Sequence, residues 1–249
     1  MIDDFTKIEC PFVRKHYSVN PDDFKKHGSK LNLREPVVYL VTPEVTPGYE
    51  WVLEHKDTVA IEKLHGSNVG LQLEKGRLVH VQNRKNVIDL YQVLGGRGHY
   101  IEGVLAAINN QSFKDYLKDG VHYGEALGPK LNCNIYNLPT HLWYPFSKAR
   151  DSLKYSSFHK YEKSFESWNS WFQTALKSLF YCRYHKIPLS NMFTDASVPF
   201  AEGVIFYNDT VSECPGKPRM AKLRRDMYPW YYQDKLRINL EQACPSAES

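Results

Sequence analysis

The sequence has no long hydrophobic run. None of its apolar stretches, in 249 residues, approaches the roughly 18 residues that cross a lipid bilayer. The amino terminus reads MIDDFTKIEC, which is acidic and lacks the apolar segment of a signal or transit peptide. We therefore expect no membrane insertion and a soluble, cytoplasmic protein.

Paired cysteines are also missing. The five cysteines are scattered, odd in number and without a CxxC pair: Cys10, Cys133, Cys182, Cys214 and Cys244. Disulfide frameworks and zinc sites need regular cysteine spacing, so this pattern argues against both and favours a reducing compartment.

The charge balance is too even to define a partner by itself. A formal net charge of +4 is small for this length, although it is compatible with a basic groove on a mixed surface. Hydrophobic residues make up 42% and aromatic residues 14%, enough for a packed core. No repeat or low-complexity tract is present, and the length favours one substantial domain.

The residue pattern predicts an α+β protein. Residues 1–50 carry several prolines and one apolar run, which indicates an extension packed on a core domain that spans 51–249. Alternation in TVAIEK places Lys63 and Ile61 on one side of a strand and Glu62 on the other. Two strands within 68–83 are joined by a turn at Gly76. Further strands are predicted at 37–41, 121–125, 142–146, 201–207 and 219–225, with helices at 101–116 and 158–179.

The helix predicted at 158–179 has an aromatic stripe. Its apolar residues recur at spacings of three and four: Phe158, Tyr161, Phe165, Trp168, Phe172, Leu176 and Leu179. Such a stripe is more often part of the core than a platform for stacking bases. A role in assembly with other molecules is the alternative.

The segment around Lys63 indicates chemistry. Lys63 stands at a strand end, and Gly66 follows in a turn where the backbone can approach a phosphate. A lysine attacks phosphorus only as the neutral amine, so a nucleophilic role requires a site that lowers its pKa. An arbitrary lysine is far more often just a solvated surface charge.

Three other segments supply the partners that such a lysine needs. Period-two geometry places Lys222 and Arg224 on one face of a strand, opposite apolar neighbours. Glu202 opens an apolar strand, where a carboxylate needs a cation or a metal, and Glu125 ends an aromatic strand before a Gly-Pro turn. Together these residues suit metal-assisted attack on ATP.

These segments resemble the motifs of a known family. Lys63-x-His65-Gly66-x-Asn68 resembles motif I of the RNA ligase 2-type enzymes, which are ATP-dependent covalent nucleotidyltransferases and include phage double-strand RNA ligases and RNA-editing ligases. Four further segments resemble the family's motifs III, IIIa, IV and V, in the family's order: residues 123–125, 143–146, 202–206 and 222–224. The resemblance implies an adenylation domain of antiparallel sheets flanked by helices, with the ATP site between the sheets.

The resemblance also implies a role for each matched residue. Lys63 would attack the α-phosphate of ATP and carry AMP. Glu202 would hold Mg²⁺ or Mn²⁺, and His65 and Asn68 would contact pyrophosphate or the nucleic-acid 5′-phosphate. Lys222 and Arg224 would contact the α-phosphate and lower the pKa of Lys63. The remaining ATP or AMP contacts would come from Glu62 at the adenine edge, Glu125 at the ribose and Phe146 stacked on adenine. Arg84 would contact the ribose or a substrate phosphate.

The implied function is ATP-dependent sealing of RNA 3′-hydroxyl and 5′-phosphate ends, as in RNA repair, with nicked duplex as one form of the substrate. AMP passes from Lys63 to the 5′-phosphate before the 3′-hydroxyl attacks. Only 27 residues follow Lys222 in this 249-residue sequence (249 − 222), so we expect no separate carboxy-terminal domain. Nick recognition would then use the core, residues 1–50 or a partner protein.

Two positions depart from the family pattern. Arg224 stands where lysine is common, and arginine binds phosphate with a different shape. Pro145 removes a backbone donor, which indicates an edge strand or bulge and leaves Tyr144 as a rival to Phe146 for stacking on adenine.

Other functions remain open at this point. A DNA ligase or a capping-type nucleotidyltransferase would share the lysine chemistry, although those enzymes usually carry aspartate at the position of His65. A non-catalytic nucleic-acid-binding module with the same fold is a further alternative.

Overall fold

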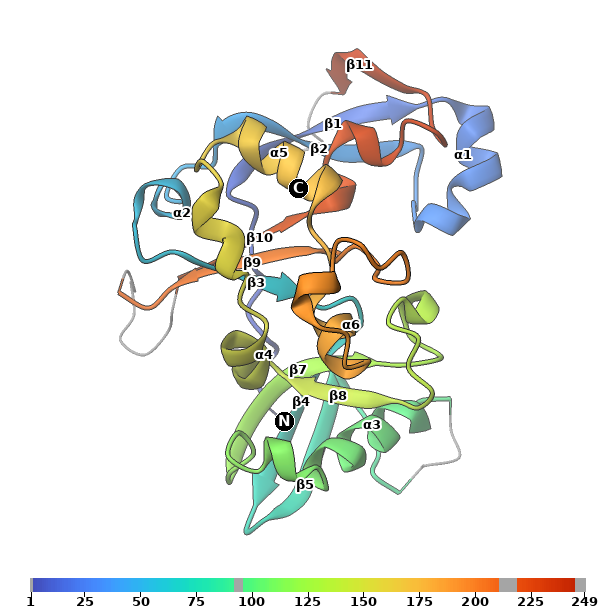
Figure 1. Cartoon of the computed structure of the whole chain (residues 1–249). Helices are drawn as coiled ribbons and strands as arrows, with labels where there is room; N and C mark the ends of the chain where they lie inside the picture. Colours follow the sequence, from blue (N-terminus) through green and yellow to red (C-terminus); the bar gives the residue numbers. More distant parts are fainter. Residues whose placement is uncertain (1, 92–95, 211–218, 245–249) are drawn as a thin grey trace. The chain divides into compact units, whose positions relative to one another are not determined.

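The computed structural model describes residues 2–91, 96–210 and 219–244. Figure 1 shows a mixture of short helices and antiparallel sheets, as the α+β class predicts. The chain divides into two compact units. Unit 1 comprises Met1–Lys7, Leu64–Tyr155 and Lys177–Ala201, and unit 2 comprises Ile8–Lys63, Ser156–Leu176 and Glu202–Ser249. The predicted boundary at residue 50, the absence of a carboxy-terminal domain and the ATP site between the sheets stay predictions.

Unit 2 contains two three-stranded antiparallel sheets. The first has the order β11-β1-β2, with β1 at Phe12–Val19, β2 at Val37–Val45 and β11 at Ile238–Cys244. The second has the order β10-β9-β3, with β3 at Val59–Lys63, β9 at Gly203–Asn208 and β10 at Arg219–Arg224. Its helices are α1 (Pro21–His27), α2 (Trp51–Glu54) and α5 (Phe165–Thr174), with 3₁₀ turns at Ser29–Leu31, Ser156–Lys160, Arg225–Met227 and Pro229–Tyr231.

Aromatic packing covers one face of the β10-β9-β3 sheet. The rings of Trp168 on α5 and Phe206 on β9 stack with centroids 4.8 Å apart, and Phe158 lies 5.7 Å from Phe206. Phe158, Trp168 and Phe172 are all buried. The aromatic stripe therefore belongs to the core, as predicted, and it leaves the opposite face of this sheet for polar side chains.

The stripe does not form the single helix predicted at 158–179. A 3₁₀ turn at Ser156–Lys160 is followed by α5 and then by α6 (Leu179–Tyr184) in unit 1. Two serine side chains start these helices: Ser164 accepts from the Ser167 amide and Ser178 from the Tyr181 amide. The prediction was wrong because N-capping serines, which satisfy free amide groups at a helix start, divide the periodic stretch.

Unit 1 is built on a five-stranded antiparallel sheet of order β6-β5-β4-β7-β8. The strands are β4 (Ser67–Glu74), β5 (Arg77–Asn83), β6 (Asn86–Val87), β7 (Gly120–Leu127) and β8 (Leu142–Pro145). Helices α3 (Gly98–Ile108), α4 (Phe146–Ser152) and α6 accompany them, with 3₁₀ turns at Gln111–Phe113, Asn132–Asn134 and Leu189–Asn191. Trp143, fully buried, donates from its indole to the carbonyl of Val69 at 3.0 Å and so links β8 to β4.

Several local predictions are confirmed in unit 1. The β4–β5 hairpin turns at Lys75 and Gly76, both with positive φ, as a two-residue turn between strongly twisted strands requires. β8 is an edge strand ending at Pro145.

The helix predicted at 101–116 ends at Ile108 instead, because the Asn110 side chain accepts from the Ser112 amide and starts a separate 3₁₀ turn.

None of the helices in the described part of the chain combines the length and the apolar character needed to cross a lipid bilayer.

Candidate active site

The strand register of unit 2 brings the predicted lysines and arginine together. Lys63 at the end of β3 and Arg224 at the end of β10 both pair with Gly203 on the central strand β9. Lys222 pairs with Ile205, two residues further along β9. Directly opposed residues in antiparallel strands point to the same face, so three cationic side chains project from one face of this sheet.

The other face of the same strands is buried and mostly apolar. Ala60 and Glu62 on β3 are each 1% exposed, and Ala221 and Leu223 on β10 are fully buried. This confirms the alternation predicted for both strands. It also places Glu62 on the face opposite Lys63, within the packed interior.

Glu202 completes the cluster immediately before β9. Its Oε2 accepts a hydrogen bond from Lys63 Nζ at 2.6 Å, and its Oε1 lies 3.9 Å from a guanidinium nitrogen of Arg224. The side chains of Lys63 and Glu202 are 21% and 15% exposed, so both keep some contact with solvent. The carboxylate lies between two of the three cations.

The backbone around Glu202 is held firmly. The amide of Arg225 donates to the Glu202 carbonyl at 2.9 Å. A Cβ on Gly203 would lie 2.2 Å from the carbonyl oxygen of Leu223, so the close approach of β9 and β10 requires glycine here. Sequence reasoning did not assign this role to Gly203, although a glycine beside a strand-end acid was a visible signal.

The pKa of Lys222 is lowered by its surroundings in unit 2. Partial burial lowers this pKa most, and the positive charges of Arg224 and Lys63 lower it further. The negative charge of Glu9, just before β1, raises the pKa of Lys222, and the positive charge of Arg14 on β1 lowers it. The Lys222 amide also donates to the Glu9 carbonyl at 2.8 Å.

Unit 1 holds the second group of predicted residues. Asn68 on β4 pairs with Glu125 on β7, and Glu125 accepts from the amide of Gly66 at 3.0 Å. A Cβ on Gly66 would come within 2.2 Å of the Ala126 carbonyl oxygen, which explains why glycine occupies this turn. Glu125 is 8% exposed. The His65–Asn68 turn and the Glu125 carboxylate thus form one hydrogen-bonded structure.

Two residues that the sequence reasoning missed also support this turn. The His65 amide donates to the Tyr136 hydroxyl at 2.8 Å, and the Asn132 side chain donates to the Gly66 carbonyl. Asn132 and its two successors all have positive φ, a conformation that asparagine tolerates better than most residues. The Asn-Cys-Asn sequence was the available signal for this unusual backbone.

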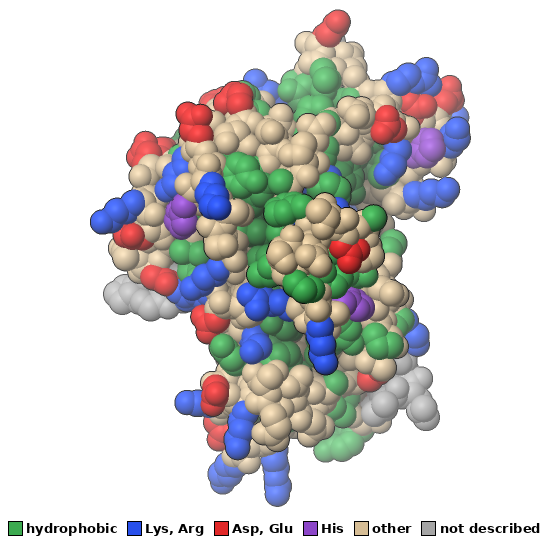
Figure 2. All heavy atoms as spheres, in the orientation of Figure 1, with side chains coloured by type: hydrophobic (Ala, Val, Ile, Leu, Met, Phe, Trp, Pro, Cys, Tyr) green, Lys and Arg blue, Asp and Glu red, His purple; other side chains and the backbone are tan. Residues whose placement is uncertain are grey.

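Arg84 lies in the tight turn between β5 and β6, with φ of 52°, and its side chain is exposed. The side chain of the preceding residue, Asn83, donates to the Asn68 carbonyl at 3.1 Å and so connects this turn to the start of β4. Figure 2 shows Lys and Arg side chains projecting at the lower end of the molecule, over the β4–β5 hairpin.

The two aromatic candidates for adenine stacking occupy different environments. Tyr144 is 8% exposed, shares a hydrogen bond with Ser152 and meets Phe113 and Phe180 edge to face. Phe146 is the first residue of α4, half-buried, with its ring 5.0 Å from that of Phe5. Tyr144 is therefore a core residue, and Phe146 has the more accessible ring.

The structure therefore assembles the predicted residues in two groups. Unit 2 contains Glu62, Lys63, Glu202, Lys222 and Arg224, and unit 1 contains His65, Asn68, Arg84, Glu125 and Phe146. The described residues include no cluster of three or more histidine, cysteine or carboxylate side chains able to hold a metal.

Comparisons with known proteins find similarity in structure only. No protein-family model matches the chain, and no curated protein matches it. The structure is similar to that of a Naegleria gruberi RNA ligase with PPi, at a TM-score of 0.38 and 12% identity, over 74% of this chain and 54% of the ligase. A Naegleria gruberi RNA ligase mutant with ATP and Mn has a TM-score of 0.35 and 10% identity, over 93% of this chain and 63% of its own. The chain thus spans less than two thirds of the length of these ligases.

Proposed function

We propose that the protein is an ATP-dependent RNA ligase that stores AMP on Lys63. The observation that carries this proposal is the cluster on one face of the β10-β9-β3 sheet: Lys63 Nζ lies 2.6 Å from Glu202, and Lys222 and Arg224 project from the same face. A nucleophile, an acid and two further cations match the charges of a reacting triphosphate.

In the first step, the neutral amine of Lys63 attacks the α-phosphorus of ATP. A nitrogen–phosphorus bond forms, the bond to the bridging oxygen breaks, and pyrophosphate leaves with that electron pair. Lys222 and Arg224 balance the negative charge on the α-phosphate, since this chemistry depends on positioning and electrostatics. Arg224 offers a guanidinium fork, which can hold two phosphate oxygens at once.

Glu202 fits a role in binding Mg²⁺ or Mn²⁺. Its carboxylate provides the hard oxygen ligands that these ions prefer, and magnesium is commonly held by one or two carboxylates together with substrate phosphates. The ion would supply charge neutralisation at the reacting phosphate. Because Glu202 contacts Lys63 directly, any cation that this carboxylate holds lies beside the nucleophile.

The unit 1 residues would serve the nucleotide and the RNA ends. The turn at His65–Asn68 follows Lys63 closely in the sequence. Glu125 is hydrogen-bonded to this turn. We assign Glu125 and Arg84 to the ribose, Phe146 to adenine, and His65 and Asn68 to pyrophosphate or the RNA 5′-phosphate. AMP then moves to that 5′-phosphate as the nitrogen–phosphorus bond to Lys63 breaks. A 3′-hydroxyl attacks the activated 5′-phosphorus, the strand is sealed and AMP leaves.

Incubation with ATP or GTP labelled at the α-phosphate, in the presence of Mg²⁺, tests the first step. Only ATP should label the wild-type protein, and Lys63→Ala should abolish the label. Lys56→Ala is the matched control, because Lys56 is an exposed lysine of the same unit. Labelling by GTP instead would indicate a capping-type enzyme, and equal labelling of Lys63→Ala would exclude Lys63 as the nucleophile.

Sealing assays identify the acceptor. A nicked duplex with an RNA 3′-hydroxyl strand should be joined, whereas the same nick made wholly of DNA should not. Preferential joining of the DNA nick would contradict the assignment as an RNA ligase.

A further inference from the structure

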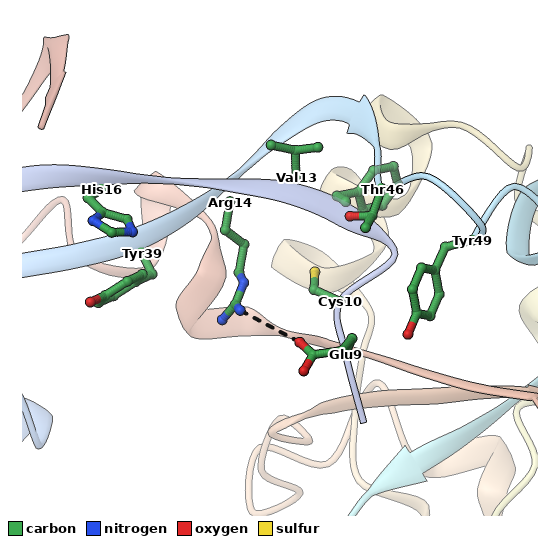
Figure 3. A pocket seen from close by; sticks show the side chains of 9 residues that line it. Glu9, Cys10, Val13, Arg14, His16, Tyr39, Thr46 and Tyr49 are labelled. Atoms are coloured by element: carbon green, nitrogen blue, oxygen red, sulfur yellow. Dashed lines mark ion pairs between the residues drawn. The ribbon is translucent and has the colours of Figure 1, made fainter. Parts of the chain in front are cut away.

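Unit 2 has a cavity that the adenylylation chemistry does not use. It measures about 450 Å³ and is lined by residues of β1 and β2, by residues directly before β1 and by residues shortly after β2. Its lining combines aromatic rings with one cation and one acid: Glu9, Arg14, His16, Tyr39 and Tyr49. Figure 3 shows the His16 and Tyr39 rings beside each other, with Arg14 pointing towards Glu9.

The two faces of the β11-β1-β2 sheet differ sharply. On one face, Val19, Val38 and Leu40 pack against Tyr232 and Leu236 and form a buried apolar cluster. The other face carries Arg14, His16 and Tyr39, because Arg14 pairs with Val41 and His16 pairs with Tyr39 across the two strands. Core packing therefore accounts for the first face, whereas Arg14, His16 and Tyr39 on the second face lie outside that cluster.

Two aromatic rings lie side by side on this second face, and one of them is well exposed to solvent. The Tyr39 ring is 43% exposed and lies 4.3 Å from the His16 ring, at an interplanar angle of 57°. Exposed aromatic side chains on a sheet whose other face is packed are the usual platform for unstacked bases of single-stranded nucleic acid. Every base has a π-face, so this platform requires no particular sequence.

Charged groups beside the rings match the remainder of a nucleotide. The Arg14 guanidinium has the shape and charge to bind a phosphate. The Glu9 carboxylate lies 3.9 Å from Arg14 and accepts hydrogen bonds, which suits a ribose 2′-hydroxyl that DNA lacks. One cavity thus offers partners for base, phosphate and ribose.

The cavity also adjoins the reacting cluster within the same unit. The Lys222 amide donates to the Glu9 carbonyl at 2.8 Å, so the backbone of the cavity wall is bonded to the strand that carries Lys222 and Arg224. A strand bound here would run from the aromatic pair past Arg14 towards the phosphate-binding cations.

We propose that this cavity binds a nucleotide of single-stranded RNA next to the end that is sealed. His16 and Tyr39 stack on its base, Arg14 contacts its phosphate and Glu9 accepts from its 2′-hydroxyl. The inference rests on the proposed RNA ligase function and names the surface by which the substrate strand is held.

Fluorescence anisotropy with a labelled, 5′-phosphorylated RNA of about 12 nucleotides tests this subsite. Tyr39→Ala should weaken binding by about fivefold to a hundredfold through the lost stacking. Arg14→Ala should reduce the slope of log Kd against log salt by about 0.7, the amount expected for one phosphate contact to a single strand. Tyr91→Ala and Arg77→Ala are the matched controls, since both side chains are exposed and lie in unit 1.

Equal affinity of wild type, Tyr39→Ala and Arg14→Ala would overturn the proposal, as would equal losses in the control variants. A DNA strand of the same sequence should bind more weakly than RNA, and equal binding would contradict the role of Glu9. Failure of the proposed function gives a different result, because it would leave the wild-type protein without covalent label from ATP.

Discussion

Lys63 and Glu202 form the contact on which the proposed chemistry depends. The carboxylate touches the amine at 2.6 Å and lies 3.9 Å from Arg224, so one acid organises two cations on the same sheet face. A carboxylate that contacts only one surface lysine would contribute little. The shared position of Glu202 is what suits it to a triphosphate site.

We predict that Glu202→Gln removes at least about a hundredfold of the adenylylation rate, because the amide keeps the shape but loses the charge that holds a divalent cation. Covalent labelling with ATP at saturating Mg²⁺ measures this rate. Glu44→Gln, at an exposed position on β2, should label normally. A fully active Glu202→Gln protein would exclude the metal-binding role.

Lys222 gives the site a dependence on pH. Because partial burial and neighbouring cations lower its pKa, Lys222 loses its charge at a lower pH than a free lysine, whose pKa is about 10.4. The folded state then binds this proton more weakly than the unfolded chain, so its contribution to stability rises with pH between the two pKa values.

For function, the same shift predicts weaker ATP binding at alkaline pH. The affinity for α,β-methylene-ATP should begin to fall at a lower pH in the wild-type protein than in Lys222→Arg, because arginine keeps its charge. Titration calorimetry between neutral and alkaline pH compares the two proteins. Superimposable pH profiles would show that the charge of Lys222 does not contribute to nucleotide binding.

At the level of elements, the central strand β9 positions the whole cluster. Gly203 pairs with Lys63 on one side and Arg224 on the other, and its lack of a side chain allows β10 to approach. On the opposite face of β9, the Phe206 ring packs against Trp168 of α5. The geometry at Lys63 therefore depends on one glycine and one buried ring.

We predict that Gly203→Ala destabilises the protein by about 1–3 kcal/mol, since the added Cβ would meet the Leu223 carbonyl and force the backbone apart. Thermal unfolding measures the loss, and labelling below the new Tm should also fall. Gly96→Ala is the control, because a Cβ there meets no described atom within 4 Å. An unchanged Tm for Gly203→Ala would mean that β9 and β10 can separate at no cost.

Strands were more predictable from the sequence than helices. Period-two alternation around Lys63 and Lys222 directly reflects which side chains are buried, so it located the faces of β3 and β10 correctly. The predicted helix lengths were wrong where a polar side chain caps the backbone, as at Asn110 and Ser164. Periodicity continued through these positions, but local hydrogen bonds ended the helices.

For the whole molecule, the interleaved order of the two units was beyond the reach of local patterns. Each unit is assembled from three separate segments, and one of the changes from unit to unit falls between Lys63 and Leu64. Motif spacing predicted a set of site residues, but not that Glu9 and Arg14 lie in the same unit as Lys222, more than half the sequence away. Contacts between distant segments arise from tertiary packing, which a single sequence does not record.

The central claim is that Lys63 carries AMP, and peptide mass spectrometry after incubation with ATP and Mg²⁺ tests it most directly. The peptide containing Lys63 should gain the mass of one AMP, and the bond should break in acid, as phosphoramidates do. AMP found on Lys222 or another lysine, or no added mass on any peptide, would contradict the account.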